Sequence, residues 1–216
     1  YDPVNDFTPV TRIAAVNNVL VVHPSMPVRS VKELVALVKA RPGQFVFASS
    51  GNGSTSHLAM ELLKTTVGGF NAVHVPYKGV APAIVDLVAG HVHALVSTMP
   101  TAVPHVQSGR VRALAVASLT RAAALKDVPT FDESGYRGFE ASAWNAVLVP
   151  AGTPQDVVNR LNAAVVKIVQ SADVREKLFA QGADPVGDTP EQFSAYLKSE
   201  LAKWAKVAKA SGARID

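Results

Sequence analysis

The sequence predicts an α/β protein in which strands alternate with helices. Hydrophobic residues make up 48% of the 216 residues and charged residues only 18%, which favours a globular chain. Short β-branched runs alternate with amphipathic stretches along most of its length. Because parallel strands need helical crossovers, this alternation indicates a parallel sheet covered by helices. A chain of this length can bury about 70% of the surface that it exposes when unfolded.

The first half of the chain shows the alternation most clearly. A long β-branched run at residues 13–22 predicts a strand, and Ser30-Val31-Lys32-Glu33 fits a capping box that begins a helix. That helix is expected to end at Arg41-Pro42-Gly43. The same pattern then recurs. The further strands and helices that we expect are 45–48, 55–67, 72–75, 82–89, 92–96 and 100–107, followed by a strand at 111–117.

The second half changes character after residue 117. Glycines and a Lys-Asp-Val-Pro-Thr sequence predict a loop-rich connector at 118–138, and residues 144–149 predict one more strand. Helices with a hydroxyl N-cap and acidic or amide residues in the first turn follow at Thr153-Pro154-Gln155-Asp156, Ser171-Ala172-Asp173 and Thr189-Pro190-Glu191-Gln192. We therefore expect one α/β domain at 17–117 and a second body made of 1–16 and 118–216, with chain crossings near 13–18 and 117–121.

The composition excludes several classes of protein. The chain has no cysteine, which excludes a thiol nucleophile, a disulfide and a Cys-ligated metal site. The net charge of +4 suits an anionic partner, but only 6% of the residues are aromatic, so we expect no nucleic acid. The densest basic stretch has the spacing of a solvated helix face and comprises Lys198, Lys203, Lys206 and Lys209. No apolar run approaches the roughly 18 residues of a membrane span, so we expect no direct membrane insertion, and the first residues do not form a signal peptide.

The most informative stretch is the glycine- and hydroxyl-rich turn at residues 48–57. It lies between a predicted strand and a helix N-terminus, where backbone N–H groups and the helix dipole favour an anion. The Walker and dinucleotide-binding glycine patterns are absent. A structural N-capped turn is the alternative, and we favour binding of a carboxylate or phosphate. The candidate binding residues in this turn are Ser50, Asn52, Gly53, Ser54, Thr55 and His57.

Two later strand-to-helix turns belong to the same edge of the predicted sheet. Ligands of open parallel sheets bind outside the carboxyl ends of the strands, so the turns are expected to form one pocket with the first. As alternatives to ligand binding, Lys78 would be a solvated loop lysine and Tyr77 a half-buried packing residue. The candidate residues are Tyr77, Lys78, Gly79 and Ala81 in one turn and Ser97 and Thr98 in the other.

The histidines require a test for metal binding or catalysis. His91 and His93 alternate along a predicted strand, and His57 and Glu61 are four residues apart on a predicted helix. Two imidazoles without a nearby carboxylate are a weak metal signal, and the G-x-S-x-G elbow of hydrolases is absent. We therefore predict no catalytic residue, no metal and no cofactor. The rival hypothesis is a transferase or metal-assisted hydrolase that uses these histidines in one cleft.

Five motifs in fixed order carry a family resemblance. They are DPVNDFTPV at 2–10, SGNGSTSHLAMEL at 50–62, VPYKG at 75–79, RALAV at 112–116 and VPAGTP at 149–154. Together they resemble the Bug-type extracytoplasmic solute receptors of tripartite tricarboxylate transporters. The resemblance spans essentially the whole chain.

The resemblance implies both a fold and a function. It implies a periplasmic-binding-protein fold of the Venus-flytrap, type II-like kind, with two lobes of parallel or mixed sheets and helices. Residues 17–117 would be the second lobe, and 1–16 with 118–216 the remainder of a first lobe that lacks the family's N-terminal part, including its signal peptide. The implied protein is a monomeric periplasmic receptor, not an enzyme. It would capture a small carboxylate and deliver it to a membrane permease, and a ligand-sensing subunit of a signalling system is the alternative role.

Overall fold

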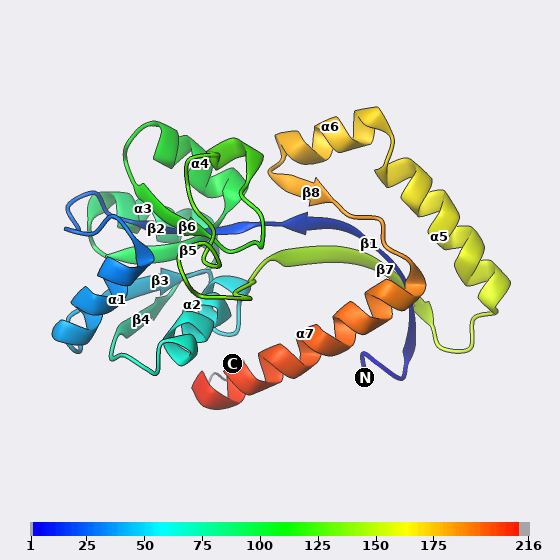
Figure 1. Cartoon of the computed structure of the whole chain (residues 1–216), viewed down its shortest axis with the longest axis horizontal. Coiled ribbons are helices and arrows are strands. Elements are labelled where there is room, and N and C mark those ends of the chain that lie inside the picture. Colours follow the sequence, from blue (N-terminus) through cyan, green and yellow to red (C-terminus); the bar gives the residue numbers. More distant parts are fainter. Residues whose placement is uncertain (1, 212–216) are drawn as a thin grey trace. The chain divides into compact units, whose positions relative to one another are not determined.

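The computed structural model describes residues 2–211 and divides the chain into two compact units (Figure 1). Unit 1 comprises Tyr1–Val16 and Ala143–Lys206, and unit 2 comprises Asn17–Ser142 and Val207–Asp216. Residues 1 and 212–216, which fall within the predicted first-lobe segments, lie outside the described residues.

Unit 2 is built on a mixed five-stranded sheet in the order β4-β3-β5-β2-β6. Strand β3 (Val46–Ser49) pairs in parallel with both β4 (Val73–Pro76) and β5 (Ala94–Thr98). Strand β2 (Asn18–Val22) runs antiparallel to β5 and to β6 (Arg112–Val116). The carboxyl ends of β3, β4 and β5 therefore meet at one edge of the sheet, together with the amino end of β2.

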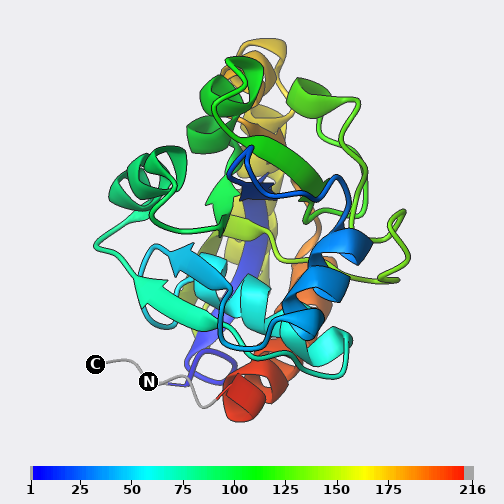
Figure 2. The same ribbon diagram turned by 90° about the vertical axis from the view of Figure 1, so that its left-hand side faces the viewer.

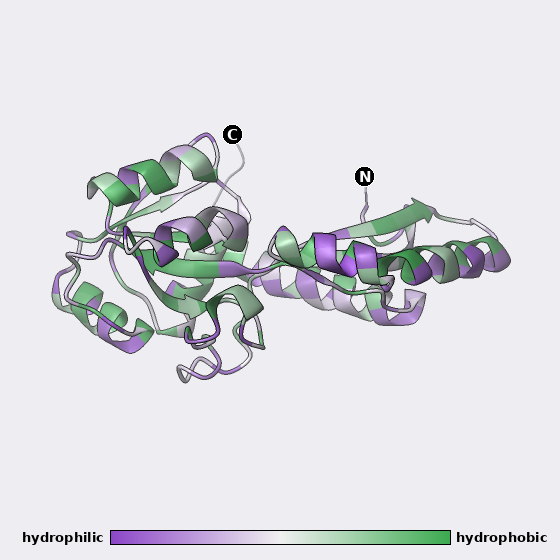
Figure 3. Cartoon of the chain, turned by 90° about the horizontal axis from the view of Figure 1, so that it is seen from above, coloured by the Kyte–Doolittle hydropathy of each residue, from purple (hydrophilic) through white to green (hydrophobic). Residues whose placement is uncertain are grey.

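Helices cover both faces of this sheet (Figures 1 and 2). Helices α1 (Val31–Ala40) and α2 (Thr55–Thr66) lie on one face, and α3 (Val80–Ala89) and α4 (Met99–Gln107) lie on the other. Every residue of β2 is buried, as expected for a central strand whose alternate side chains serve two cores. The strands are coloured mostly as hydrophobic in Figure 3, whereas the helices carry both colours.

The predicted N-cap Ser30 at the start of α1 is confirmed, and Glu33 reaches back as predicted, although to the N–H of Arg29 and not to that of Ser30. The Ser30 hydroxyl accepts a hydrogen bond from Glu33 N at 3.2 Å, and the Glu33 carboxylate accepts one from Arg29 N at 2.6 Å. One orphan N–H group of the helix start, that of Glu33, is thus satisfied by a neighbouring side chain, and the Glu33 carboxylate fixes the residue before the N-cap, which is why this boundary is readable from local sequence.

The long strand predicted at 13–22 is wrong, because the chain changes sheets at Asn17. Residues up to Val16 belong to β1 (Phe7–Val16), whereas β2 begins at Asn18. The backbone carbonyl of Asn17 accepts a hydrogen bond from Met99 N at 3.0 Å. One apolar stretch, interrupted by Asn17 and Asn18, thus carries two strands of different sheets, which hydrophobic periodicity alone does not reveal.

Unit 1 contains a three-stranded antiparallel sheet in the order β7-β1-β8. Strand β7 (Ala143–Pro150) confirms the predicted strand, and β8 (Ala183–Pro185) is too short to have produced a periodic signal. The helices of this unit are α5 (Gln155–Val169), α6 (Ala172–Ala180) and α7 (Pro190–Ser211), whose last residues belong to unit 2. The Trp144 ring packs edge-on against Phe193 and Tyr196 of α7, with ring centroids 5.7 and 6.0 Å apart.

The structure places the connector after residue 117 in unit 2, whereas the sequence predicts that it belongs to the first-lobe segments. Residues 118–142 lie in unit 2, and the chain crosses between units at 16–17, at 142–143 and within α7. The connector is held by β6, because Val116 N donates to Pro129 O and Phe131 N donates to Val116 O, at 2.9 and 3.1 Å. Leu125, in the short helix η1 (Ala123–Leu125), also joins the core of unit 2. These contacts link residues that are distant in sequence, so the composition shift gave the wrong boundary.

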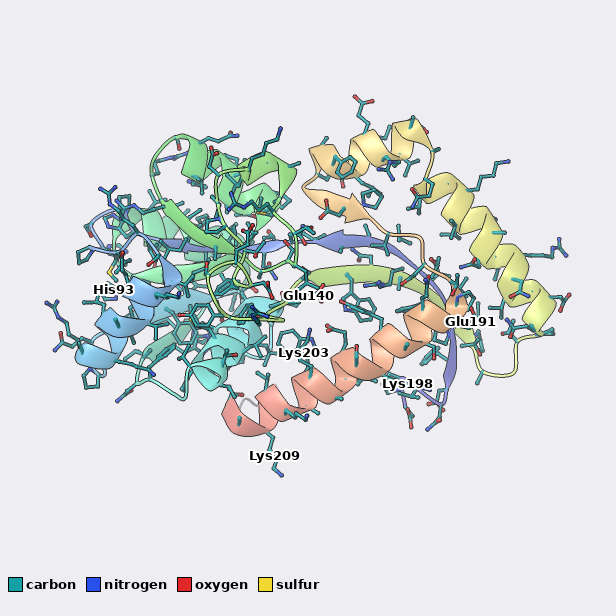
Figure 4. The ribbon with its side chains drawn as sticks, in the orientation of Figure 1. His93, Glu140, Glu191, Lys198, Lys203 and Lys209 are labelled. Atoms are coloured by element: carbon teal, nitrogen blue, oxygen red, sulfur yellow. The ribbon has the colours of Figure 1, made fainter. Side chains whose placement is uncertain are left out.

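The basic face predicted near the C-terminus lies on α7. Lys198, Lys206 and Lys209 are exposed, whereas Lys203 is partly buried and forms an ion pair with Glu200 (Figure 4). Within residues 2–211, no helix has the combination of length and apolar composition that crossing a membrane requires.

Candidate functional site

Three strand-to-helix turns lie side by side at one edge of the unit 2 sheet. The β3–α2 and β4–α3 turns are joined directly, because Tyr77 N donates to Ser49 O at 3.0 Å and Gly79 N donates to Ser50 O at 3.2 Å. Gly51 has a φ of 131°, and a Cβ atom there would lie 3.4 Å from the Tyr77 carbonyl oxygen. The backbone conformation thus favours glycine at this position, and a side chain there would touch the neighbouring turn.

The hydroxyl groups of the β3–α2 turn bind mainly to one another and to the turn itself. Ser56 Oγ accepts a hydrogen bond from Ser50 N at 2.8 Å, and Ser54 Oγ donates to Gly51 O at 2.7 Å. Ser54 also caps α2 by accepting from His57 N at 3.3 Å. The N-terminus of α2, which the sequence suggested as the anion site, is therefore partly satisfied from within.

The N-termini of α3 and α4 have no such cap. Gly79 stands at the N-cap of α3 with a φ of 109°, and it has no side chain to offer the first turn. Thr98 stands at the N-cap of α4 without a side-chain cap bond, and its hydroxyl lies 3.2 Å from that of Thr101. In α4, Met99 N donates to the Asn17 carbonyl at 3.0 Å and Pro100 has no N–H group, which leaves the N–H group of Thr101 as the donor that its first turn can offer. The N-termini of α3 and α4 flank the β3–α2 turn. Partial positive charge accumulates at such ends.

The predicted site residues divide by exposure. Exposed at this edge are Asn52, Thr55, Lys78 and Ala81; partly buried are Ser50, Gly53, Ser54, Tyr77, Gly79 and Thr98; fully buried are His57 and Ser97. The structure thus brings all twelve residues to the same edge but leaves His57 and Ser97 below its surface. The Ser97 hydroxyl donates to Thr98 O at 3.2 Å.

The Tyr77 side chain is fixed by Asp86. Its hydroxyl donates to Asp86 Oδ2 at 2.6 Å, and Asp86 Oδ1 lies 3.3 Å from His91 Nδ1. Burial, assisted by the hydrogen bond to the Asp86 carboxylate, raises the pKa of Tyr77 to about 12. The Tyr77 hydroxyl is therefore a neutral donor that is already engaged, which leaves the ring face and backbone of this residue for other contacts.

Sequence reasoning missed three buried polar residues next to the α4 N-terminus. Asn18 pairs with Thr98 in the sheet register, and its Nδ2 donates to Ala141 O at 2.6 Å. The Ser142 hydroxyl donates to Asn17 Oδ1 at 3.1 Å. The signal that could have found them is the Asn17-Asn18 pair, which interrupts an otherwise β-branched run. Their partners lie more than a hundred residues away, so the contacts themselves were not predictable.

The histidines named in the enzyme hypothesis do not converge. His93 Nδ1 accepts a hydrogen bond from Val46 N at 2.9 Å, at the amino ends of β3 and β5 and close to α1 (Figure 4). His91 lies beside Asp86, and His57 Nδ1 accepts from Gly53 N at 3.1 Å. Among the described residues, no group of three or more His, Asp or Glu side chains could hold a metal ion. The arrangement therefore does not support the metal-assisted chemistry considered from the sequence.

Comparison with known proteins gives one family. Residues 1–213 match the family described as tripartite tricarboxylate transporter family receptor. The whole chain is 40% identical to Protein BugT of Bordetella pertussis strain Tohama I, of which it covers 66%. It is 39% identical over 96% of its length to a UPF0065 protein from a tcbD-tcbE intergenic region of Pseudomonas sp. strain P51, of which it covers 62%. The chain thus spans about two thirds of the length of these relatives.

Solved structures give the same result. The chain is similar to R. palustris Rpa4515 with adipate, with 40% identity and a TM-score of 0.82 over 99% of this chain and 71% of that one. For the periplasmic binding protein BugD the values are 33% identity and a TM-score of 0.78, over 98% and 71%. MatC from Rhodopseudomonas palustris with bound malate is 31% identical to the chain, with a TM-score of 0.78 over 96% of this chain and 71% of that one.

These comparisons confirm the predicted class of fold and the resemblance that the five motifs carry. The relatives found are periplasmic solute-binding proteins, and the family is one of receptors, not of enzymes. The chain belongs to the tripartite tricarboxylate transporter receptor family.

Proposed function

We propose that the protein is a periplasmic receptor that captures a small carboxylate at the turn-bearing edge of unit 2 and delivers it to a tripartite transporter permease. The observation that carries this proposal is the pair of helix N-termini, those of α3 and α4, that lack a side-chain cap beside a glycine-rich turn. Family membership supports it, as do two relatives whose structures contain adipate and malate.

The chemistry of this edge favours a carboxylate. Each uncapped helix N-terminus stabilises a nearby anion by about 0.3–1 kcal/mol, and a hydrogen bond to a charged group adds about 1.5–3 kcal/mol. The first turn of α3 offers the N–H groups of Val80 and Ala81, whereas Pro82 has none. Thr98 and Thr101 bring hydroxyl donors, and the exposed Lys78 brings a positive charge.

We assign the remaining contacts to the residues that are accessible at this edge. They are Ser50, Asn52, Gly53, Ser54, Thr55, Tyr77, Gly79 and Ala81, in addition to the donors above. Binding is reversible and breaks no covalent bond, since the edge holds donors and no paired nucleophile and base. A sensing role would use the same bound state, and uptake measurements separate the two.

A proline at position 80 tests the α3 N-terminus. Proline fits the first helical position, and the ψ of 169° at Gly79 suits a residue that precedes proline, so Val80→Pro is expected to keep the helix and remove one N–H donor. Loss of a hydrogen bond to a carboxylate is expected to weaken binding of adipate or malate about 10- to 100-fold in isothermal titration calorimetry.

The matched control is Val80→Ala, which loses the same packing against the core of unit 2 but keeps the N–H group. It is expected to bind within about threefold of the parent protein. Equal losses of affinity in the two variants would show that the α3 N-terminus does not bind the carboxylate. If neither adipate, malate nor an aromatic carboxylate binds at millimolar concentration, the carboxylate assignment is wrong.

Location and delivery are tested in cells. The protein is expected in the periplasmic fraction, and deletion of its gene is expected to abolish uptake of the carboxylate that it binds. Normal uptake in the deletion strain, together with a change in gene expression in response to that carboxylate, would favour the sensing role.

A further inference from the structure

We propose that His57 and His74 are positioning residues that hold the β3–α2 turn in its binding conformation while both rings are neutral, and that protonation of His57 releases the turn. The inference rests on the proposed function, because it takes this turn to contact the ligand. It gives His57 a role different from the direct contact that the sequence suggested, and His74 a role where the sequence suggested none.

The two histidines form a stack with a core phenylalanine. The His57 and His74 rings are 4.0 Å apart between centroids with an interplanar angle of 11°, and His74 lies 4.8 Å from Phe47 at 16°. Phe47 is 1% exposed and His57 is 6% exposed. The three rings come from β3, β4 and α2, so the stack ties the helix that follows the turn to the strands below it.

His57 holds the middle of the turn through its neutral form. Gly53 N donates to His57 Nδ1 at 3.1 Å, and a ring nitrogen accepts a hydrogen bond only when it carries no proton. The neutral ring must therefore have its proton on Nε2. Protonation of His57 Nδ1 would place its N–H group opposite the N–H group of Gly53, and the hydrogen bond between them would be lost.

His74 holds the start of the same turn. Its Nε2 lies 2.6 Å from Ser49 Oγ, and that hydroxyl accepts from Gly51 N at 3.2 Å and donates to Gly51 O at 3.1 Å. The histidine pair thus fixes both Gly51 and Gly53. Glycines have little conformational preference of their own, so side-chain contacts of this kind decide the shape of the turn.

The surroundings keep the pair neutral at neutral pH. Burial lowers the pKa of His57, with Glu61 opposing this shift and Lys64 adding to it. Burial, and then the charge of His57, lowers the pKa of His74 to about 4. Glu61 and Lys64 lie on α2 and are 3.4 Å apart, so they largely offset each other.

Acidification is therefore expected to weaken ligand binding. A released or unfolded histidine has a pKa near 6.5, whereas in the stack burial lowers the pKa of His57 and lowers that of His74 to about 4. Below pH 6.5, protons therefore bind preferentially to the state in which the stack is broken, so the held turn loses population as the pH falls.

The experiment compares His57→Asn with His57→Leu. The asparagine Oδ1 can accept from Gly53 N at every pH, whereas leucine has no acceptor. At about pH 7.5 we expect His57→Asn to bind adipate or malate within about threefold of the parent, and His57→Leu to bind about tenfold more weakly. Between about pH 7.5 and 5, the parent is expected to lose about tenfold more affinity than His57→Asn. Protonation of the ligand is common to both and cancels in this ratio.

Identical pH profiles for the parent and His57→Asn would overturn the inference while leaving the proposed function intact. A second measurement needs neither variant nor ligand. Nitrogen NMR is expected to show the Nε2–H tautomer of His57 and a Gly53 amide resonance that follows the His57 titration. An Nδ1–H tautomer, or a Gly53 amide that does not respond, would overturn the inference even if no carboxylate binds.

Discussion

Replacing Asp188 by alanine is expected to lower the free energy of unfolding of unit 1 by about 3–5 kcal/mol. The Asp188 carboxylate accepts hydrogen bonds from Arg12 Nε at 2.6 Å and from Arg12 N at 2.7 Å. The side chains of Asp188 and Arg12 are 7% and 18% exposed. Without the carboxylate, the Arg12 guanidinium, which lies 3.6 Å from the centroid of the Tyr196 ring, keeps its charge in a mostly buried place.

The two tryptophans make this prediction measurable. Trp144 and Trp204 both lie in unit 1, so urea unfolding followed by tryptophan fluorescence reports on that unit. The control is Asp156→Ala, which removes an exposed carboxylate from the first turn of α5 and is expected to cost less than about 1 kcal/mol. A cost for Asp188→Ala no larger than that of the control would show that the buried pair does not stabilise the unit.

Replacing Phe47 by alanine is expected to cost unit 2 about 3–5 kcal/mol. Phe47 is 1% exposed, and the centroids of its ring and the His74 ring are 4.8 Å apart. Alanine therefore leaves a cavity in the core and removes the ring on which the two histidines stack. Urea unfolding followed by far-ultraviolet circular dichroism measures the loss. Val73→Ala on neighbouring β4 is the control, because Val73 is 46% exposed and is expected to cost less than about 1 kcal/mol. Similar costs for the two variants would contradict this account of the core.

Elements with local causes could be predicted from the sequence. The start of α1 follows from Ser30 and Glu33, and the end of α3 follows from Gly90, which adopts the left-handed conformation with a φ of 80°. The three turns at one sheet edge were predictable because each follows a strand and precedes a helix. Features that depend on distant partners were not predictable. The change of sheet at Asn17 and the antiparallel direction of β2 are both set by pairing with β5.

In the candidate site, too, features with local causes were predictable and features that depend on distant contacts were not. Its location was predictable, but the roles of its residues depend on contacts across the fold. Ser54 and Ser56 have ligand-like chemistry, yet their hydroxyls hold the turn itself. His57 is predicted from the sequence to face a ligand, yet its ring stacks on His74 and accepts a hydrogen bond from Gly53 N. Conversely, the α3 N-terminus is important because Gly79 provides no side-chain cap. This difference is recognised only when α3 is compared with the neighbouring helix α2, which Ser54 caps.

A carboxylate is expected to bind at the N-termini of α3 and α4. The most direct test is a titration of the nitrogen-15 labelled protein with adipate or malate, following each backbone amide by NMR. We expect the amide resonances of Val80, Ala81 and Thr101 to shift with a Kd equal to that from calorimetry. Saturable binding that leaves these three amides unmoved would contradict this expectation.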